Sequence, residues 1–374
     1  MRTRSLSRFA VSVLLLLTGC PEGGGGDGGF GGTAAVLYTA NDGSNTVSGF
    51  TIGAGGALSP TNPATVGANN TEWLTVSSNG QFLYASNQGN HTISGFTVNG
   101  TTGVLTSIGA SITVPGTTPS PRGITMTPNQ QFIYVANSAT NTIAGFSIGA
   151  GGVLTSTAQG IISTGETLAR GIAVSPNGQY LYVANSGSNT ISGFTIGAGG
   201  VLTTIGTPVS TGAGSNPESL TISPSGSFMF VVYRGTDRVG AFAIGSGGTL
   251  TPAVPQSSFL TGTLGGESPQ RIAISPNGSF LYVANTGTNE IAVFTIGSGG
   301  QLTRITPNTS TGAGTAPIGI TIEPTGQFLY VANSGTKEVG SFMVGSGGIL
   351  TTTTPATFTV LPQVPVGIAT PGRP

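Results

Sequence analysis

Residues 169–203 read ARGIAVSPNGQYLYVANSGSNTISGFTIGAGGVLT, and this stretch decides the fold. It contains three short runs rich in branched and aromatic side chains, at residues 171–175, 179–185 and 189–196, separated by Ser, Pro, Asn and Gly. Such runs, bounded by turn residues, are typical of short antiparallel strands. The glycine cluster at 197–200 leads into VLT, which we expect to begin a fourth strand.

The same pattern returns about every 48 residues from residue 35 onward, in seven copies. Each copy keeps an aromatic residue in its second strand, at Tyr38, Tyr84, Tyr134, Tyr182, Phe230, Tyr282 and Tyr330. Each also keeps a phenylalanine in its third strand, at Phe50, Phe96, Phe146, Phe194, Phe242, Phe294 and Phe342. A period of this length, with four strand signals and no helical periodicity, predicts an all-β protein: a seven-bladed β-propeller with four-stranded antiparallel blades.

The glycine clusters could either cradle a phosphate or turn the chain. They recur at Gly53, Gly149, Gly197, Gly245, Gly297 and Gly345, and the remaining copy has VNGTTG at 98–103 instead. A phosphate-binding loop opens a helix, whereas these clusters are followed by another strand signal. Because glycine supplies the positive φ angles of tight turns, we interpret the clusters as turns between the third and fourth strands.

The two ends of the repeat region predict how the ring closes. The chain enters the repeats with a second strand, AAVLYTAN at 34–41, and ends with VPVGIATP at 364–371, an innermost strand without partners. We therefore expect the C-terminal innermost strand to join the N-terminal strands and complete the first blade. Such closure removes free sheet edges. The predicted propeller domain is 34–374.

The N-terminal residues predict export and lipid anchoring. MRTRSLSR followed by FAVSVLLLL has the charged start and short apolar run of a secretory signal. Leu17-Thr18-Gly19-Cys20 resembles a bacterial lipobox, so we expect a lipoprotein signal peptide at 1–19 and acylation of Cys20, the only cysteine. Residues 20–33 then form a glycine-rich linker, which tethers the propeller to the cell envelope. Pro21 after the cysteine favours the outer membrane.

Composition limits the partners and cofactors. Only 6% of the residues are charged, the formal net charge is zero, and no Lys/Arg cluster follows residue 8. This balance predicts no nucleic-acid partner. The chain has one histidine and one cysteine, and its aspartates are scattered, so we expect no metal and no cofactor. We expect a monomer whose membrane contact is the acylated Cys20.

The YVAN core followed by an N-T-I or N-E-I strand, with FTVNGTTGVL at 96–105, resembles the seven-bladed propeller family of bacterial lactonases. That family includes 6-phosphogluconolactonases, carboxymuconate cyclase relatives and YVTN-repeat surface proteins, and the resemblance covers residues 35–370. It implies a catalytic channel lined by His, Arg and Glu, with a Pro-Arg-His opening to the innermost strand. Pro121-Arg122-Gly123 and Ala169-Arg170-Gly171 keep the arginine but have glycine in place of the histidine, and the sole histidine, His91, falls in a loop.

The residues just before each innermost strand should ring the mouth of the central channel. Aligning the seven copies gives Glu72, Arg122, Arg170, Glu218, Gln270, Ile318 and Val366 in one ring. The next ring holds Trp73, Gly123, Gly171, Ser219, Arg271, Gly319 and Gly367. Blade five adds Tyr233 and Arg234 on the same face, where other copies have Asn followed by a small polar residue. In so weakly charged a chain, this concentration of charge marks the candidate site.

Three functions fit these residues. The first is binding of a small anionic or polar ligand, or of a protein partner, at the charged mouth, with Arg122, Trp73, Gln270, Arg234 and Tyr233 as ligand contacts. The second is a lactonase-type hydrolase of a sugar or aromatic-acid lactone, with Glu218 or Glu72 as general base and Arg170 and Arg271 polarising the carbonyl. The third is a structural scaffold in which the Glu and Arg side chains only pair with one another.

Overall fold

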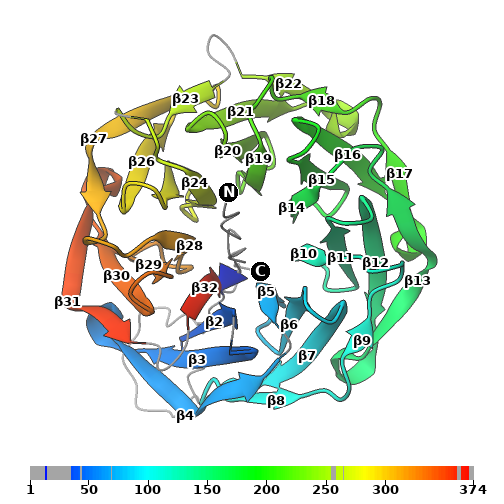
Figure 1. The fold of residues 1–374 in the computed structure, drawn as a ribbon, viewed down its shortest axis with the longest axis horizontal. Helices are drawn as coiled ribbons and strands as arrows, with labels where there is room; N and C mark the ends of the chain where they lie inside the picture. Colours follow the sequence, from blue (N-terminus) through cyan, green and yellow to red (C-terminus); the bar gives the residue numbers. More distant parts are fainter. Residues whose placement is uncertain are drawn as a thin grey trace, which may run out of the picture.

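The computed structural model describes residues 13–14, 35–42, 44–68, 70–253, 258–263, 265–359 and 364–369. Seven antiparallel blades surround a central channel, as the repeats predict (Figure 1). Within this part of the chain, no helix is long and apolar enough to cross a membrane. The predicted signal peptide, Cys20 and the glycine linker lie outside the described residues, apart from β1 (Val13–Leu14), which pairs in parallel with the last strand.

The strands are named here by their place in a blade, from the channel outward. The innermost strands are β32 (Val364–Ala369), β5 (Thr71–Val76), β10 (Pro121–Met126), β14 (Ala169–Val174), β19 (Pro217–Ile222), β24 (Pro269–Ile274) and β28 (Pro317–Ile322), in blades one to seven. The second strands are β2 (Val36–Asp42), β6 (Phe82–Asn87), β11 (Phe132–Asn137), β15 (Tyr180–Asn185), β20 (Phe228–Tyr233), β25 (Phe280–Asn285) and β29 (Phe328–Asn333). The third strands are β3 (Thr46–Ile52), β7 (Thr92–Val98), β12 (Thr142–Ile148), β16 (Thr190–Ile196), β21 (Arg238–Ile244), β26 (Glu290–Ile296) and β30 (Glu338–Val344).

The outermost strands are of two kinds. Four are continuous: β4 (Leu58–Gly67), β13 (Leu154–Ser163), β27 (Leu302–Ser310) and β31 (Leu350–Thr359). In blades two, four and five the outermost strand is split into β8 (Leu105–Ser107) and β9 (Ile112–Thr113), β17 (Leu202–Thr204) and β18 (Val209–Ser210), and β22 (Leu250–Pro252) and β23 (Ser258–Leu260). Short 3-10 turns precede five of these strands: η1 (Ala54–Gly56), η2 (Ala150–Gly152), η3 (Ala198–Gly200), η4 (Ser246–Gly248) and η5 (Ser346–Gly348).

The glycine clusters turn the chain and also join neighbouring blades. Gly199 and Gly200 have φ angles of 68° and 75°, which glycine adopts without strain. The buried Tyr134 of blade three donates a 2.9 Å hydrogen bond to the carbonyl oxygen of Gly200 in blade four. Equivalent bonds run from Tyr38, Tyr84, Tyr182 and Tyr330 to Gly103, Gly152, Gly248 and Gly56. The repeat tyrosine and the turn glycine are therefore two halves of one contact between blades.

The last strand closes the ring. β32 pairs antiparallel with β2, with Ile368 opposite Thr39, so blade one is built from both ends of the repeat region (Figure 1). Ile368 and Ala369 are buried in the core of this blade together with Leu37 and Tyr38. The predicted closure is confirmed.

The innermost strands begin with a β-bulge, and this irregularity positions the site. In β5, Thr71 lies opposite Asn87 and Trp73 lies opposite Ser86, so Glu72 is an extra residue in the pairing. Similar shifts occur at the start of β10, β14, β19, β24 and β28. Because a bulge disrupts the strict alternation of faces, successive residues such as Glu72 and Trp73 can both be turned toward the channel.

Candidate active site

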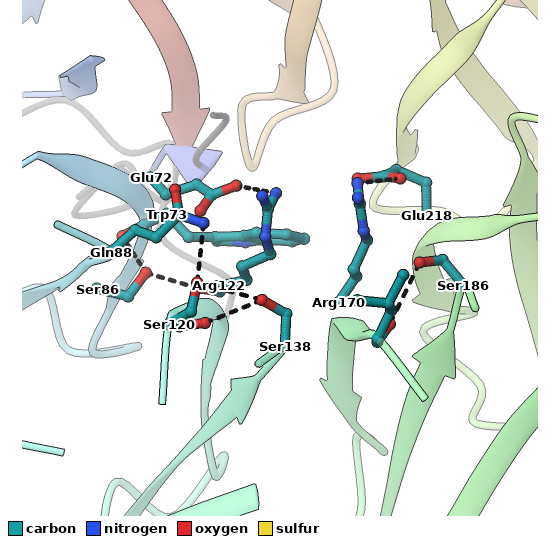
Figure 2. A network of polar contacts seen from close by, with 11 residues as sticks. Glu72, Trp73, Ser86, Gln88, Ser120, Arg122, Ser138, Arg170, Ser186 and Glu218 are labelled. Carbon is teal, nitrogen blue, oxygen red and sulfur yellow. Dashed lines mark hydrogen bonds and ion pairs between the residues drawn. The ribbon is translucent and has the colours of Figure 1, made fainter. Parts of the chain in front are cut away.

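Six of the predicted residues meet at the mouth of the central channel. They are Glu72, Trp73, Arg122, Arg170, Glu218 and Arg271, which we call the channel-mouth cluster. They come from the bulged starts of five innermost strands, β5, β10, β14, β19 and β24. Residues far apart in the sequence therefore form one charged group with three arginines and two glutamates. Figure 2 shows Arg122 and Arg170 with the two glutamates and Trp73.

Two ion pairs hold the glutamates. Arg122 Nη1 donates to Glu72 Oε1, and Arg170 Nη1 contacts Glu218 Oε1 at 2.6 Å and Oε2 at 2.7 Å (Figure 2). Both carboxylates are almost inaccessible, since Glu72 is 1% and Glu218 6% exposed. The arginines lie nearer the solvent, with 10% of the Arg122 side chain and 22% of the Arg170 side chain exposed. A molecule entering from this face would therefore meet the arginines first.

Gln88 links the Glu72–Arg122 pair to the neighbouring loop. Its amide contacts Ser120 Oγ at 2.9 Å. In the amide orientation that satisfies both of its polar atoms, the nitrogen donates to Glu72 Oε2 at 3.3 Å and the oxygen accepts from Arg122 Nη2 at 3.1 Å. Ser120 also donates its backbone N–H to His91 Nδ1 at 3.3 Å. The sole histidine thus supports the loop beside Arg122 through Ser120.

Trp73 and Arg271 form a stacked pair beside the ion pairs. The guanidinium carbon of Arg271 lies 3.2 Å from the centroid of the indole ring, a cation–π contact between two buried side chains. Both residues also line a cavity of about 200 Å³ in the channel, whose other walls include Ile172, Leu220 and Ile320. The ion-paired residues do not line this cavity, so the stacked pair joins the charged cluster to a space whose walls carry both apolar and hydroxyl side chains, among them Thr125, Ser219 and Thr221.

The two glutamates differ in their protonation chemistry. Burial raises the pKa of Glu72 above its ordinary value, although Arg122, Arg271 and Arg170 act in the opposite direction. Burial also opposes the charge on Glu218, but Arg170 and Arg271 together outweigh it, so the pKa of Glu218 is lowered. Burial lowers the pKa of Arg271 to about 9. The environment of Glu218 therefore favours its charged form, whereas burial of Glu72 works against its charged form.

Glycines in the second ring bring the innermost strands close together. A Cβ atom at Gly123 would lie 2.3 Å from the carbonyl oxygen of Arg170, and one at Gly171 would lie 2.8 Å from that of Glu218. Side-chain atoms do not approach backbone this closely. Gly123 thus stands where the resemblance implies a histidine, and the backbone of the next blade fills the room that its side chain needs.

Three of the predicted ligand contacts take no part in the ion pairs or the stacked pair of the cluster. Arg234 is exposed and its Nε donates to Ser268 Oγ at 3.3 Å. Tyr233 is buried in blade five at 4% exposure, and burial raises the pKa of its hydroxyl above the ordinary value. Gln270 is half-buried on β24, and no hydrogen bond recorded for the described residues joins it to the cluster.

Gln88 is the member of the site that the sequence analysis missed. It follows the last residue of β6, where blades three, four and seven have Ser138, Ser186 and Ser334. These serines donate to backbone carbonyls of the loop before the innermost strand, whereas Gln88 reaches the ion pair itself. Gln88 departs from the repeat at this position, and this departure is the sequence signal that identifies it.

The described part of the chain contains no group of three or more His, Cys, Asp or Glu side chains that could hold a metal ion. The polar chemistry visible at the channel mouth is carried by carboxylates, guanidiniums and amides.

Comparison with known proteins places this geometry in a family. The family model described as a lactonase, 7-bladed β-propeller, matches residues 32–119, 118–262 and 246–360. A search of curated proteins finds no match.

Solved structures share the fold across almost the whole chain. A candidate 6-phosphogluconolactonase from Bacteroides uniformis is 21% identical, with a TM-score of 0.77 over 89% of this chain and 98% of that one. The periplasmic gluconolactonase PpgL of Pseudomonas aeruginosa is 20% identical, with a TM-score of 0.74 over 89% of this chain and 96% of that one. A protein from Lactobacillus plantarum is 21% identical, with a TM-score of 0.74 over 90% of this chain and 99% of that one.

Proposed function

Because the chain belongs to the family of seven-bladed β-propeller lactonases, we propose that its channel-mouth cluster hydrolyses a small lactone, with Glu72 as the general base. The observation that carries this proposal is the contrast between the two glutamates. Glu72 is a buried carboxyl with a raised pKa, and Glu218 is an ion-paired carboxylate with a lowered one. A pair of titratable groups whose pKa values are pushed apart is typical of acid–base sites.

The proposed reaction adds water across the ring ester. Glu72 takes a proton from a water molecule, and the hydroxide oxygen bonds to the lactone carbonyl carbon. Arg122 and Arg170, the more exposed guanidiniums, stabilise the negative charge that develops on the carbonyl oxygen. The bond from that carbon to the ring oxygen then breaks, and Glu72 returns its proton to the leaving alkoxide. The product is a hydroxycarboxylic acid, which is a carboxylate at neutral pH.

The arginines are also able to bind the product, and one of them is held in a fixed direction. A guanidinium binds a carboxylate through paired hydrogen bonds, so Arg122 and Arg170 favour the ring-opened anion over the neutral lactone. Glu218 holds the Arg170 side chain through both carboxylate oxygens and so fixes its direction. Glu218 is therefore assigned a positioning role, in place of the alternative in which it acts as the base.

The test is ring opening of neutral sugar lactones and aromatic-acid lactones, followed by proton release. We expect turnover by the wild type and a loss of about 100-fold or more in kcat for Glu72→Gln. Glu218→Gln should raise KM as well as lower kcat, because Arg170 loses its fixed direction. Retention of full turnover by Glu72→Gln would contradict the mechanism.

A second function, binding of a small carboxylate without turnover, is favoured by one specific observation. Both carboxylates of the cluster are already paired with arginines, and Gly123 occupies the position of the family's channel histidine. Absence of turnover on every lactone, together with saturable binding of gluconate that Arg122→Gln abolishes, would establish this function instead.

The cellular location follows from the N-terminal residues and is also proposed. The apolar run and the Leu17–Cys20 motif support export, acylation of Cys20 and attachment to the cell envelope, with the outer membrane favoured. Fractionation after labelling with a radioactive fatty acid tests this. Cys20→Ser should abolish the label and release the protein from the membrane fraction, and a labelled Cys20→Ser variant would contradict the assignment.

A further inference from the structure

A second charged cleft lies on the outer side of the ring, between blades five and six. Its volume is about 450 Å³, and it is lined by Arg238, Phe259, Leu260, Phe294 and Arg304, with Gly262 and Thr263 at one side. Residues on β21 and β23 supply the wall from blade five, and residues on β26 and β27 supply the wall from blade six. None of these residues belongs to the channel-mouth cluster.

Two related clefts show what is particular to this one. Clefts also lie beside the split outermost strands of blades two and four, with volumes of about 200 and 160 Å³. Their walls are built from Tyr, Ile, Gly and other uncharged residues. The cleft beside blade five is more than twice as large as either, and two arginines line it. Its volume falls in the range usual for small-molecule sites.

Arg238 departs from the repeat at a position with a defined structural role. In blades one to four, an Asn that ends the second strand donates to a Thr that begins the third, as Asn185 does to Thr190 at 3.2 Å. In blade five both partners are changed together, to Tyr233 and Arg238. The repeat therefore does not require Arg238, whose Nη1 makes only 3.5 Å contacts to the oxygens of Ser258.

Arg304 departs from the repeat in the same way. It lies opposite Phe294 in the pairing of β26 and β27. Its counterparts opposite the repeat phenylalanine in the other blades are uncharged: Pro60, Ser107, Ser156, Thr204, Pro252 and Thr352. The Nη1 atom of Arg304 is buried and has no hydrogen-bond partner among the described residues. Such a donor is costly unless something bonds to it.

Neither Arg238 nor Arg304 takes part in the ion pairs found in the described part of the chain, although the carboxylate of Glu267 lies against Gly262 at the edge of the cleft. The ion pairs found within 4.0 Å in the described part of the chain are both in the channel-mouth cluster. Two guanidiniums facing one cleft favour an anion between them. The partly exposed Phe259 and the 51% exposed Leu260 offer an apolar surface beside that position.

We propose that this cleft binds a small organic carboxylate with an aromatic or aliphatic body. The carboxylate accepts hydrogen bonds from the guanidinium groups of Arg304 and Arg238, and the apolar body packs on Phe259 and Leu260. The site is independent of the lactonase proposal, because it shares no residue with the channel mouth and lies on a different side of the blades.

The test is calorimetric titration of the full chain with 3-phenylpropionate, compared with the neutral 3-phenylpropanamide. Arg304→Ser and Arg238→Thr are matched variants, because they install the residues found at these positions in blades three and four, Ser156 and Thr190. We expect saturable binding of the carboxylate, binding at least tenfold weaker in each variant, and no saturable binding of the amide. Arg170→Gln, which alters the channel mouth, should bind the carboxylate as the wild type does.

Three outcomes would overturn the proposal. They are equal binding of acid and amide, wild-type affinity in both arginine variants, and no binding of the acid up to about 10 mM, a concentration at which even weak sites fill. The thermal midpoint of wild type with and without 3-phenylpropionate gives a second readout that needs no variant, and we expect an upward shift.

Discussion

Arg271 covers the face of Trp73, with its guanidinium carbon 3.2 Å from the centroid of the indole ring. The two residues come from blades two and six, so this contact spans the channel rather than joining adjacent blades. Both residues also line the cavity of about 200 Å³ in the channel. Trp73 is the only tryptophan of the chain, which makes the contact directly observable.

Arg271→Lys should change the environment of that single indole ring. Lysine keeps a positive charge but cannot stack as a planar group, so the indole face opens to water. We expect a red shift of the tryptophan emission and stronger quenching by acrylamide. Arg238→Thr, in the outer cleft, is the control that should leave the emission unchanged. An unaltered spectrum in Arg271→Lys would show that the stacking does not persist in solution.

Neutralising the two glutamates should have unequal effects on stability. Glu218→Gln removes a favourable anion from Arg170, and for a partly exposed pair we expect a loss of about 2 kcal/mol in the free energy of unfolding. Glu72→Gln also breaks a buried ion pair, with Arg122, but burial already disfavours the charged form of Glu72, so the loss should be smaller than that of Glu218→Gln. Chemical denaturation measures both, and a larger loss in Glu72→Gln would contradict the assigned pKa directions.

The pKa directions also predict opposite pH dependences. Since the folded-state pKa of Glu72 is raised, its contribution to stability is complete below its unfolded pKa and is lost as pH rises through the folded value. The pKa of Glu218 is lowered, so its contribution is present above its unfolded pKa and is lost as pH falls through the folded value. Across acidic pH, the free energy of unfolding should therefore rise more steeply with pH in Glu72→Gln than in the wild type. It should rise less steeply with pH in Glu218→Gln.

If Glu72 is the base, activity should follow its titration. We expect kcat/KM for lactone opening to rise with pH through a pKa above the ordinary value for a glutamate, because only the carboxylate form can accept the proton of water. A pH–rate profile of the wild type measures this. An acidic limb at or below the ordinary value would assign the base to another group.

The tyrosine–glycine contacts between blades offer a matched pair of substitutions. Tyr134→Phe removes a buried hydrogen bond to Gly200 and leaves its carbonyl oxygen without that donor, at a cost of about 1–2 kcal/mol. The hydroxyl of Tyr282 is buried without a hydrogen-bond partner in the described part of the chain. Tyr282→Phe should therefore be neutral or slightly stabilising. Thermal unfolding measures the stability of both variants. Equal losses of stability would show that the hydrogen bond from Tyr134 to Gly200 does not stabilise the contact between blades.

A substitution at Gly123 tests how closely the innermost strands approach each other. Gly123→Ala should destabilise the protein by about 2 kcal/mol or more, since the added Cβ would meet the backbone of Arg170 at 2.3 Å. Gly67→Ala is the control, because no atom lies within 4 Å of its Cβ position and its φ angle is not positive. A well-folded Gly123→His variant with unchanged stability would show that the channel can widen.

The repeat predicts the fold because every blade has the same pattern of strand and turn residues. The counterparts of Tyr134 and Gly200 recur in most copies, and their hydrogen bond joins neighbouring blades. The channel mouth was predicted as a ring of residues, but its pairings were not. Glu72 and Arg122 are 50 residues apart, and their meeting depends on the bulges at the start of β5 and β10. A bulge arises from the fit of two strands, so neither strand's sequence reveals it alone.

The closure of blade one also dictates the order in which the molecule can be completed. β2 is among the first strands to be synthesised, and its partner β32 ends at residue 369 of 374. Until those final residues leave the ribosome, one edge of β2 has no partner and the circle of blades stays open. From the synthesis of β2 until that of β32, the nascent chain therefore carries an unfinished edge, and an unpaired strand can associate with other chains.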